Sequence, residues 1–190
     1  MKTVLVTTQH FLRQKTERCI SEIYRREYGA SVSEFPHTLI AAFDGQDAPL
    51  CAAGLRFASS GFFSESYLEQ PIEKTLTAWT GRSIERDRIF EVTTLASRNA
   101  RASLPFLRHI IAFGETYGFD WAFFTATERL RALLRHMRLP LAVLAPAEPG
   151  RIECPERWGD YYLCGPRVCA VDGSRLGSAR VAARLAEAHA

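Results

Sequence analysis

The chain has 190 residues, a net charge of +3 and an apolar share of 47%. Such a chain is long enough to bury one hydrophobic core, so we expect a single globular domain. The positive charge is spread along the sequence, which argues against nucleic acid as the main partner. The five cysteines include no CxxC pair, which is more typical of reduced thiols than of a secreted disulfide framework.

The N-terminal segment MKTVLVTTQHF contains only a short apolar run, which is too short for the hydrophobic region of a signal peptide. No run approaches the roughly eighteen apolar residues of a membrane-spanning helix. We therefore predict a cytoplasmic protein without a transmembrane segment.

The first half of the sequence predicts a helix, a hairpin and a second helix. Apolar residues recur at helical spacing over 15–28, and Gly29 stands where a C-cap glycine belongs. Two apolar runs, 39–44 and 50–57, are separated by FDGQDAP, whose Asp-Gly pair is typical of a tight antiparallel connection. Residues 66–79 place apolar side chains on one helical face, which predicts the second helix.

The second half predicts alternating strands and helices. A strand at 89–96 is followed by a helix with Ser103 as its N-cap. The remaining elements are a strand at 119–127, a helix capped by Thr127, a strand at 139–146, a strand pair or extended flap at 158–172, and a short terminal helix at 178–190. This order predicts an α/β fold with helices on both faces of a mixed sheet, which begins with an antiparallel hairpin and continues through right-handed crossovers. One domain would span 1–177, followed by a helical tail at 178–190.

Glu91 lies in the middle of the strand predicted at 89–96. A carboxylate in a buried strand must be paired, neutralised or placed in a solvated notch. Burial would raise its pKa towards the range that suits a general base. Alternatively, Glu91 pairs with a buried arginine such as Arg56, or the strand has an exposed face. Thr93 shares the face of Glu91.

The turn after this strand, SRNARAS, combines polar side chains with the free N–H groups of a helix N-terminus, which suits a phosphate. The side chains that would contribute are Ser97, Arg98, Asn99, Arg101 and Ser103. A plain surface turn would look the same, and the segment lacks glycines that let the backbone wrap a pyrophosphate.

Three arginines of the next predicted helix, Arg131, Arg135 and Arg138, form a basic stripe that could receive a nucleotide phosphate or an acidic acyl carrier protein. The alternative is an ordinary solvated face. We predict no metal site, because the histidines lack metal-ligand spacing.

Further candidate residues lie near the ends of the later strands. A hydroxyl of Thr125 or Thr127 could line the same cleft as Glu91 or have a core or capping role. Tyr161 and Tyr162, in WGDYY, could act as an acid or line an acyl pocket, with aromatic packing as the alternative.

Several ordered motifs together resemble the thermostable hemolysin family over roughly residues 10–172. That family is similar to the GNAT acyltransferase superfamily and to N-acyl-homoserine-lactone synthases. The motifs are YRREYGA, AAGLRFA, SYLEQPIE, EVTTLAS, FDWAFFTAT with the arginine-rich helix after it, and WGDYY followed by PRV.

The resemblance implies a GNAT-like sheet and an acyl-CoA or acyl-carrier-protein thioester donor. Its phosphopantetheine arm would lie between the strand of Glu91 and the strand at 121–125, near Leu95 and Thr125. Glu91 matches the strand glutamate of the lactone synthases, and 98–103 falls on the phosphate turn of acetyltransferases. Arg101 replaces the central glycine of that turn, which makes a carrier-protein donor relatively more attractive.

The leading hypothesis is a biosynthetic acyltransferase that acts on a small amine or hydroxyl acceptor. The lactone synthases' acidic residues for S-adenosylmethionine are not recognisable after YRREYGA, so a different acceptor is implied. Glu91 would be the general base, strand-end N–H groups would polarise the thioester, and Tyr161 or Tyr162 would protonate the leaving thiolate. The alternatives are a membrane-active hemolysin-like protein and a non-catalytic domain that binds an acyl ligand or a partner.

Overall fold

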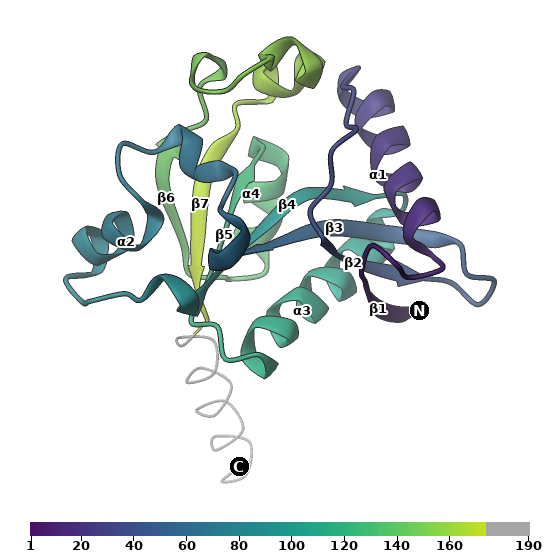
Figure 1. The fold of residues 1–190 in the computed structure, drawn as a ribbon, viewed down its shortest axis with the longest axis horizontal. Helices are drawn as coiled ribbons and strands as arrows, with labels where there is room; N and C mark the ends of the chain where they lie inside the picture. The colour runs from purple at the N-terminus through teal and green to yellow at the C-terminus, as the bar shows by residue number, and fades with distance from the viewer. Residues whose placement is uncertain (174–190) are drawn as a thin grey trace, which may run out of the picture.

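The structure, a computed structural model, describes residues 1–173. Its centre is a seven-stranded sheet with the order β1-β2-β3-β4-β5-β7-β6 (Figure 1). Among the described strands, β4 and β5 form the only parallel pair, and all other neighbours run antiparallel. The strands are β1 (Lys2–Val6), β2 (Thr38–Phe43), β3 (Pro49–Phe57), β4 (Ile89–Ser97), β5 (Trp121–Ala126), β6 (Leu141–Pro146) and β7 (Arg167–Asp172).

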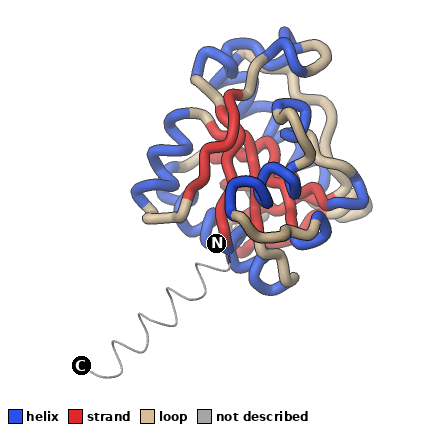
Figure 2. Tube along the Cα trace, turned by 90° about the vertical axis from the view of Figure 1, so that its left-hand side faces the viewer, coloured by secondary structure: helices blue, strands red, loops and turns tan. Residues whose placement is uncertain are grey.

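Helices cover both faces of the sheet (Figure 2). One face packs against α3 (Ala100–Thr116) and α4 (Glu128–His136). The other face packs against α1 (Arg13–Tyr28) beside β2 and β3, and against α2 (Ile72–Thr80) beside β5 and β7. This layering confirms the predicted α/β fold with helices on both faces. Five short 3₁₀ segments complete the described chain: η1 (Ala58–Ser60), η2 (Ser64–Tyr67), η3 (Arg86–Arg88), η4 (Pro149–Arg151) and η5 (Pro155–Cys164).

The local predictions in the first half are largely confirmed. α1 ends where expected, and Gly29 has a φ of +66° in the left-handed region that favours glycine. β2 and β3 form the expected antiparallel hairpin. β1 was not predicted, because a five-residue strand at the sheet edge carries a weak pattern; it is recognised only by its pairing with β2.

Two helix starts differ from the predictions. The helix predicted over 66–79 begins only at Ile72, because Pro71 is its N-cap and the preceding chain forms η2 instead. Ser103 is not the N-cap of α3. That position belongs to Asn99, whose side chain accepts a hydrogen bond from the N–H of Arg101.

The segment predicted as a strand pair or flap is a 3₁₀ segment, η5, followed by the single strand β7. β7 inserts antiparallel between β5 and β6, so the expected run of parallel crossovers ends at β5. Gly159 in η5 has a φ of +52°, and a Cβ there would lie 2.2 Å from the Tyr28 carbonyl oxygen. The η5 segment therefore approaches the end of α1 closely. The tail predicted at 178–190 lies outside the described residues.

β4 and β5 pair over only part of their lengths. The parallel register joins Ile89–Val92 to Trp121–Phe124 and then stops, so the two strands separate towards their carboxyl ends. β4 also changes register against β3 within the same region, between Ala52 and Gly54. A β-bulge of this kind bends a strand and increases its twist. The sheet is therefore split where β4 and β5 diverge.

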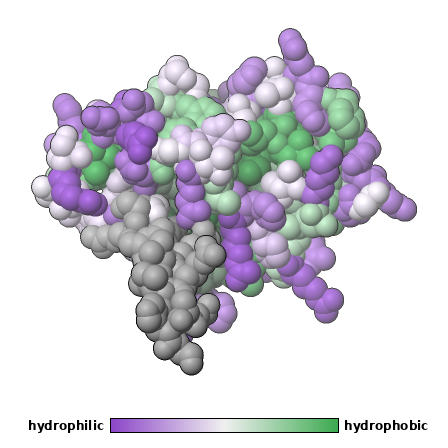
Figure 3. Space-filling model, turned by 90° about the horizontal axis from the view of Figure 1, so that it is seen from below, coloured by the Kyte–Doolittle hydropathy of each residue, from purple (hydrophilic) through white to green (hydrophobic). Residues whose placement is uncertain are grey.

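The surface carries apolar side chains from several elements. Seen from below, hydrophobic areas lie between hydrophilic residues (Figure 3). The large apolar residues with the greatest exposure are Phe11 before α1, Tyr117 after α3 and Leu163 in η5. Within residues 1–173, no helix combines the length and the apolar composition that crossing a membrane requires.

Candidate active site

A cavity of about 600 Å³ begins at the split between β4 and β5 and continues between the sheet and the helices α3 and α4. Its wall is mostly apolar and includes Val92, Leu95, Phe106, Leu107, Leu130 and Leu134. At its other end the cavity is lined by Phe90 near the start of β4, by Gly114 near the end of α3 and by Phe119. The cavity is therefore a long apolar space bounded by two strands and two helices.

One end of this cavity is polar. Ser97, Arg98 and Ser103 line it there, together with Arg26 and Tyr28 from α1. The Ser103 hydroxyl donates to the Ser97 hydroxyl at 2.9 Å, so these two side chains are fixed by each other.

The predicted phosphate turn only partly faces this space. Asn99 and Arg101 lie outside the lining, and Asn99 is committed to capping α3. The Arg98 guanidinium is paired with Glu22 of α1 and also donates to Cys19 Sγ. An anion at Arg98 would therefore compete with a carboxylate that is already bound there.

A second, smaller cavity of about 30 Å³ lies on the α1 face of the split. Its wall is largely aromatic and contains Tyr24, Phe63, Tyr67, Trp158 and Tyr161. Five residues line both cavities: Tyr24, Val92, Thr94, Thr125 and Tyr161. The two cavities therefore adjoin where the strands diverge.

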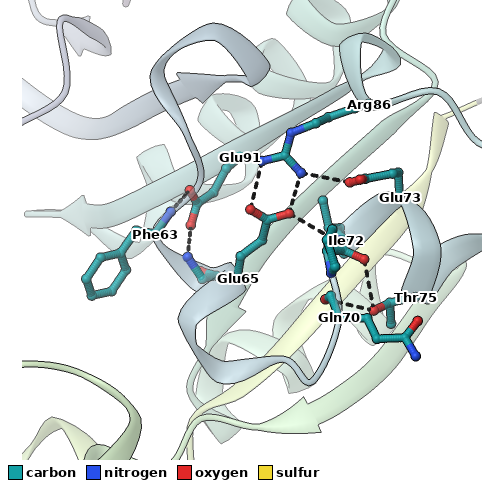
Figure 4. Close-up of polar contacts among 10 residues, drawn as sticks. Phe63, Glu65, Gln70, Ile72, Glu73, Thr75, Arg86 and Glu91 are labelled. Atoms are coloured by element: carbon teal, nitrogen blue, oxygen red, sulfur yellow. Dashed lines mark hydrogen bonds and ion pairs between the residues drawn. The ribbon is translucent and has the colours of Figure 1, made fainter.

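Glu91 is fully buried, and its carboxylate caps the turn that leads into η2 (Figure 4). Its Oε2 accepts from the Phe63 N–H and its Oε1 from the Ser64 N–H, both at 2.7 Å. Glu91 thus lies behind the cavity wall instead of in it. Arg56 is opposite Glu91 in the β3–β4 register, but the hydrogen bonds to the carboxylate come from the Phe63 and Ser64 N–H groups and from the Ser64 hydroxyl.

Burial raises the pKa of the Glu91 carboxyl above its ordinary value. Hydrogen bonds from the Ser64 hydroxyl and from the two backbone N–H groups act in the opposite direction, as does the charge of Arg56. The desolvation effect is the larger. A raised pKa is compatible with a role in proton transfer.

Ser64 connects Glu91 to both cavities. Its hydroxyl shares a hydrogen bond of 2.8 Å with the hydroxyl of Thr125 in β5. Thr125 lines the large and the small cavity, whereas Ser64 lines only the small one. A chain of polar groups therefore runs from the buried carboxylate through two hydroxyls to the split in the sheet.

Next to this chain, Glu65 and Glu73 bind the guanidinium of Arg86 (Figure 4). Glu65 Oε1 also accepts from the Ile72 N–H at 2.8 Å, which caps α2. The cluster fixes η2 and α2 to the chain just before β4. It thereby helps to position the Phe63–Ser64 turn that Glu91 binds.

The two predicted tyrosines have different positions. Tyr161 lines both cavities, and its hydroxyl is 3.4 Å from the Thr125 carbonyl oxygen. Burial raises the pKa of Tyr161 well above its ordinary value, so the phenol stays protonated. Tyr162 lies outside both linings and forms a 2.7 Å hydroxyl pair with Tyr67.

A family model described as thermostable hemolysin matches residues 6–175 of the chain. The chain belongs to the thermostable hemolysin family. None of the curated proteins compared with it matches.

Solved structures with this family member's fold include FeeM, an N-acyl amino acid synthase from uncultured soil microbes, and the acyl-homoserine-lactone synthase LasI. FeeM has a TM-score of 0.61 at 12% identity, covering 90% of this chain and 95% of its own. LasI has a TM-score of 0.61 at 7% identity, covering 90% of this chain and 89% of its own. BjaI is a CoA-dependent acyl-homoserine-lactone synthase solved with SAM and isopentyl-CoA. It has a TM-score of 0.57 at 12% identity, covering 90% of this chain and 81% of its own. At such identities the likeness establishes a shared fold.

The predicted basic stripe is not a continuous surface in this family member. Arg131 is buried, and its guanidinium donates to the carbonyl oxygens of Ala126 and Gly165. Arg135 and Arg138 are exposed. Arg131 thus ties α4 to the β5 end and is unavailable to a carrier protein. Residues 1–173 contain no group of three or more His, Cys, Asp or Glu side chains that could hold a metal ion.

Ser64 is not among the residues predicted for the site, and neither is Thr94 at the bulge of β4. Nothing near Ser64 in the sequence indicates that its turn meets a strand about thirty residues away. For Thr94 a signal was present, because an isolated glycine in a strand pattern, Gly54, suggests a bulge or a close backbone approach. A Cβ at Gly54 would lie 2.3 Å from Thr93 Oγ1.

Proposed function

We propose that this protein is an acyltransferase that moves an acyl group from a thioester to a small amine or hydroxyl acceptor. The apolar cavity of about 600 Å³ that begins at the split in the sheet carries this proposal. Cavities of this size and apolar character suit a drug-sized or acyl ligand. Support comes from the fold, which the chain shares with proteins described as an N-acyl amino acid synthase and as CoA-dependent lactone synthases.

In this proposal the acyl chain lies in the large cavity, with its far end towards Phe90 and Phe119. The phosphopantetheine arm passes the polar end at Ser97 and Ser103, and its phosphate lies near the N-terminus of α3. CoA and an acyl carrier protein present the same arm, so both are candidate donors. Arg135 and Arg138 remain as the exposed part of the candidate carrier surface.

The acceptor places its attacking nitrogen or oxygen in the small aromatic cavity, whose 30 Å³ has room for about one water-sized group. Its nitrogen or oxygen attacks the carbonyl carbon, and the acceptor's proton passes through the hydroxyls of Thr125 and Ser64 to Glu91, the proposed general base. The new C–N or C–O bond forms and the C–S bond breaks. Tyr161 donates a hydrogen bond to the departing thiolate, which takes up the proton that Glu91 received.

The test combines thioester donors with a mixture of amine and alcohol acceptors. Purified protein is incubated with acyl-CoAs and acyl carrier proteins that carry short, medium or long chains, and acylated products are identified by mass spectrometry. We expect an acylated acceptor that forms only with active protein. Donor binding without product from any acceptor would instead support a non-catalytic acyl-binding domain. Release of dye from lipid vesicles by the protein alone would favour a membrane-active protein.

A further inference from the structure

Five aromatic side chains form a cage around the small cavity: Tyr24, Phe63, Tyr67, Trp158 and Tyr161. The Trp158 ring centroid lies 5.6 Å from the Phe63 and Tyr161 centroids and 6.1 Å from the Tyr24 centroid. Phe63 and Tyr67 are 6.0 Å apart. Because the space holds about one water-sized group, an occupant lies against these rings, within the roughly 6 Å over which an aromatic ring attracts a cation.

Trp158 is held in place by contacts between η5 and the end of α1. The Ser31 N–H donates to the Arg157 carbonyl oxygen at 2.7 Å. On the other side of Trp158, Gly159 approaches the Tyr28 carbonyl oxygen so closely that a Cβ would lie 2.2 Å from it. The aromatic cage is therefore formed before any ligand binds, which lowers the entropic cost of binding.

The charges around the cage favour a cation. Within residues 1–173, no lysine, arginine or histidine lines the small cavity. Its wall includes the hydroxyl oxygens of Ser64 and Thr125, and the Glu91 carboxylate lies directly behind it, bound to the Phe63 and Ser64 N–H groups. An ammonium group would gain from the rings and from these oxygen atoms. A carboxylate placed there would be desolvated without a cationic partner.

The cage has a buried side and an outer side. Tyr24, Tyr67 and Tyr161 are buried, whereas Phe63 and Trp158 are only half-buried. The part of an acceptor that does not fit the cavity therefore extends outwards past Phe63 and Trp158. An unbranched methylene chain can lie along these two apolar rings. A carboxylate on the carbon beside the nitrogen would be pressed against them.

We propose that the acceptor is an unbranched primary amine whose ammonium group binds in the aromatic cage, and that α-amino acids are excluded. This inference rests on the proposed function and narrows its acceptor to one chemical class. The bound ammonium carries one proton more than the amine that attacks the thioester, and this proton is released to solvent before the attack. The neutral amine then reacts as described above, so the products are an amide, a thiol and the released proton.

The test uses three acceptors that share a five-carbon chain: pentylamine, 1-pentanol, which is neutral, and norleucine, which adds a carboxylate beside the nitrogen. Affinities for the full chain are measured by ligand-observed NMR, which detects weak binding. An equimolar mixture of the three is then incubated with an acyl donor, and the acylated products are quantified by mass spectrometry. We expect pentylamine to bind at least about tenfold more tightly than either of the others and to give the main product.

Ring variants identify the cage as the source of this preference. Trp158→Leu and Phe63→Leu should each lower the preference for pentylamine over pentanol by about threefold, and Trp158→Phe should retain most of it. Trp79→Leu is the matched control, because Trp79 is half-exposed and lines neither cavity. Thermal unfolding checks that the variants fold.

The outcomes separate this inference from the proposed function. If norleucine or pentanol is bound or acylated as well as pentylamine, the inference is wrong and acyl transfer still stands. An unchanged preference in both leucine variants would also overturn the role of the cage. A pentylamine preference in binding without product from any acceptor would instead support the cage and contradict the proposed enzyme.

Discussion

The hydroxyls of Ser64 and Thr125 share a hydrogen bond of 2.8 Å, although 61 residues separate them in the sequence. This contact joins the turn that Glu91 caps to the strand that faces Thr94 across the split. It gives the buried carboxylate a path to the cavities without exposing it to solvent. Such a path lets a group behind the wall of a site accept a proton from within it.

Ser64→Ala should interrupt this path while preserving the backbone N–H that binds Glu91 Oε1. In the acylation assay we expect turnover to fall about 100-fold, with little change in donor affinity. Because burial raises the pKa of Glu91, and only the ionised base accepts a proton, wild-type turnover should rise with pH through that raised pKa. The variant should lose this pH dependence.

Ser66→Ala is the matched control, since Ser66 lies in the same turn and is exposed. It should leave both turnover and the pH profile unchanged. A Ser64→Ala protein that keeps the wild-type pH profile would show that the proton takes another route.

Glu65→Gln should reduce stability in a pH-dependent manner. Burial alone would raise the pKa of Glu65, but the Arg86 guanidinium and the Ile72 N–H outweigh it and hold the pKa below its usual value. The ionised side chain therefore contributes stability that is fully present above about pH 4.5 and is lost as the pH falls through the lowered pKa.

We expect Glu65→Gln to lower the free energy of unfolding by about 1–2 kcal/mol at neutral pH, since the ion pair is only partly buried. Urea denaturation at neutral and acidic pH measures the difference, which should shrink on acidification. Glu69→Gln, at an ion pair whose carboxylate is largely exposed, should have a smaller effect. An equal loss of stability at both pH values would contradict the assigned ion pair.

Gly54→Ala should destabilise the sheet at the bulge. The added methyl would lie 2.3 Å from Thr93 Oγ1 and 2.7 Å from Pro36 Cγ, so the strands must shift to accommodate it. We expect a loss of about 1–3 kcal/mol in the free energy of unfolding. Gly45→Ala in the β2–β3 turn meets no atom within 4 Å and should change stability by less than about 0.5 kcal/mol. Similar stabilities for the two variants would rule out the close approach at Gly54.

Ala122→Leu should shorten the acyl chain that the large cavity accepts. Ala122 lines the cavity and pairs with Phe90 in the β4–β5 register, far from the polar end. Each buried methylene contributes about 0.8 kcal/mol, so filling this end should shift the preferred donor to shorter chains. Competition among acyl donors measures the preference. Ala132→Leu on the exposed side of α4 should leave the preferred chain length unchanged. If Ala122→Leu keeps the wild-type chain-length preference, the acyl chain does not lie at this end of the cavity.

Local signals in the sequence determined α1, the β2–β3 hairpin and the start of α4 correctly, because neighbouring residues supply the energy there. The C-cap glycine after α1 and Thr127 at the start of α4 act on the nearest turn of backbone, so their effect is visible without the fold. The burial of Glu91 could also be expected, because an apolar strand surrounds it on both sides in the sequence.

Only the tertiary structure decided how these elements form a site. Glu91 is bound by a turn that precedes it by 27 and 28 residues, Arg131 is drawn into backbone contacts across 34 residues, and β7 enters the sheet between two earlier strands. Such contacts depend on chain topology, because a buried polar group takes whichever partner the fold brings within hydrogen-bonding distance. The sequence thus determined that a carboxylate would be buried in β4, and the fold decided which groups bind it.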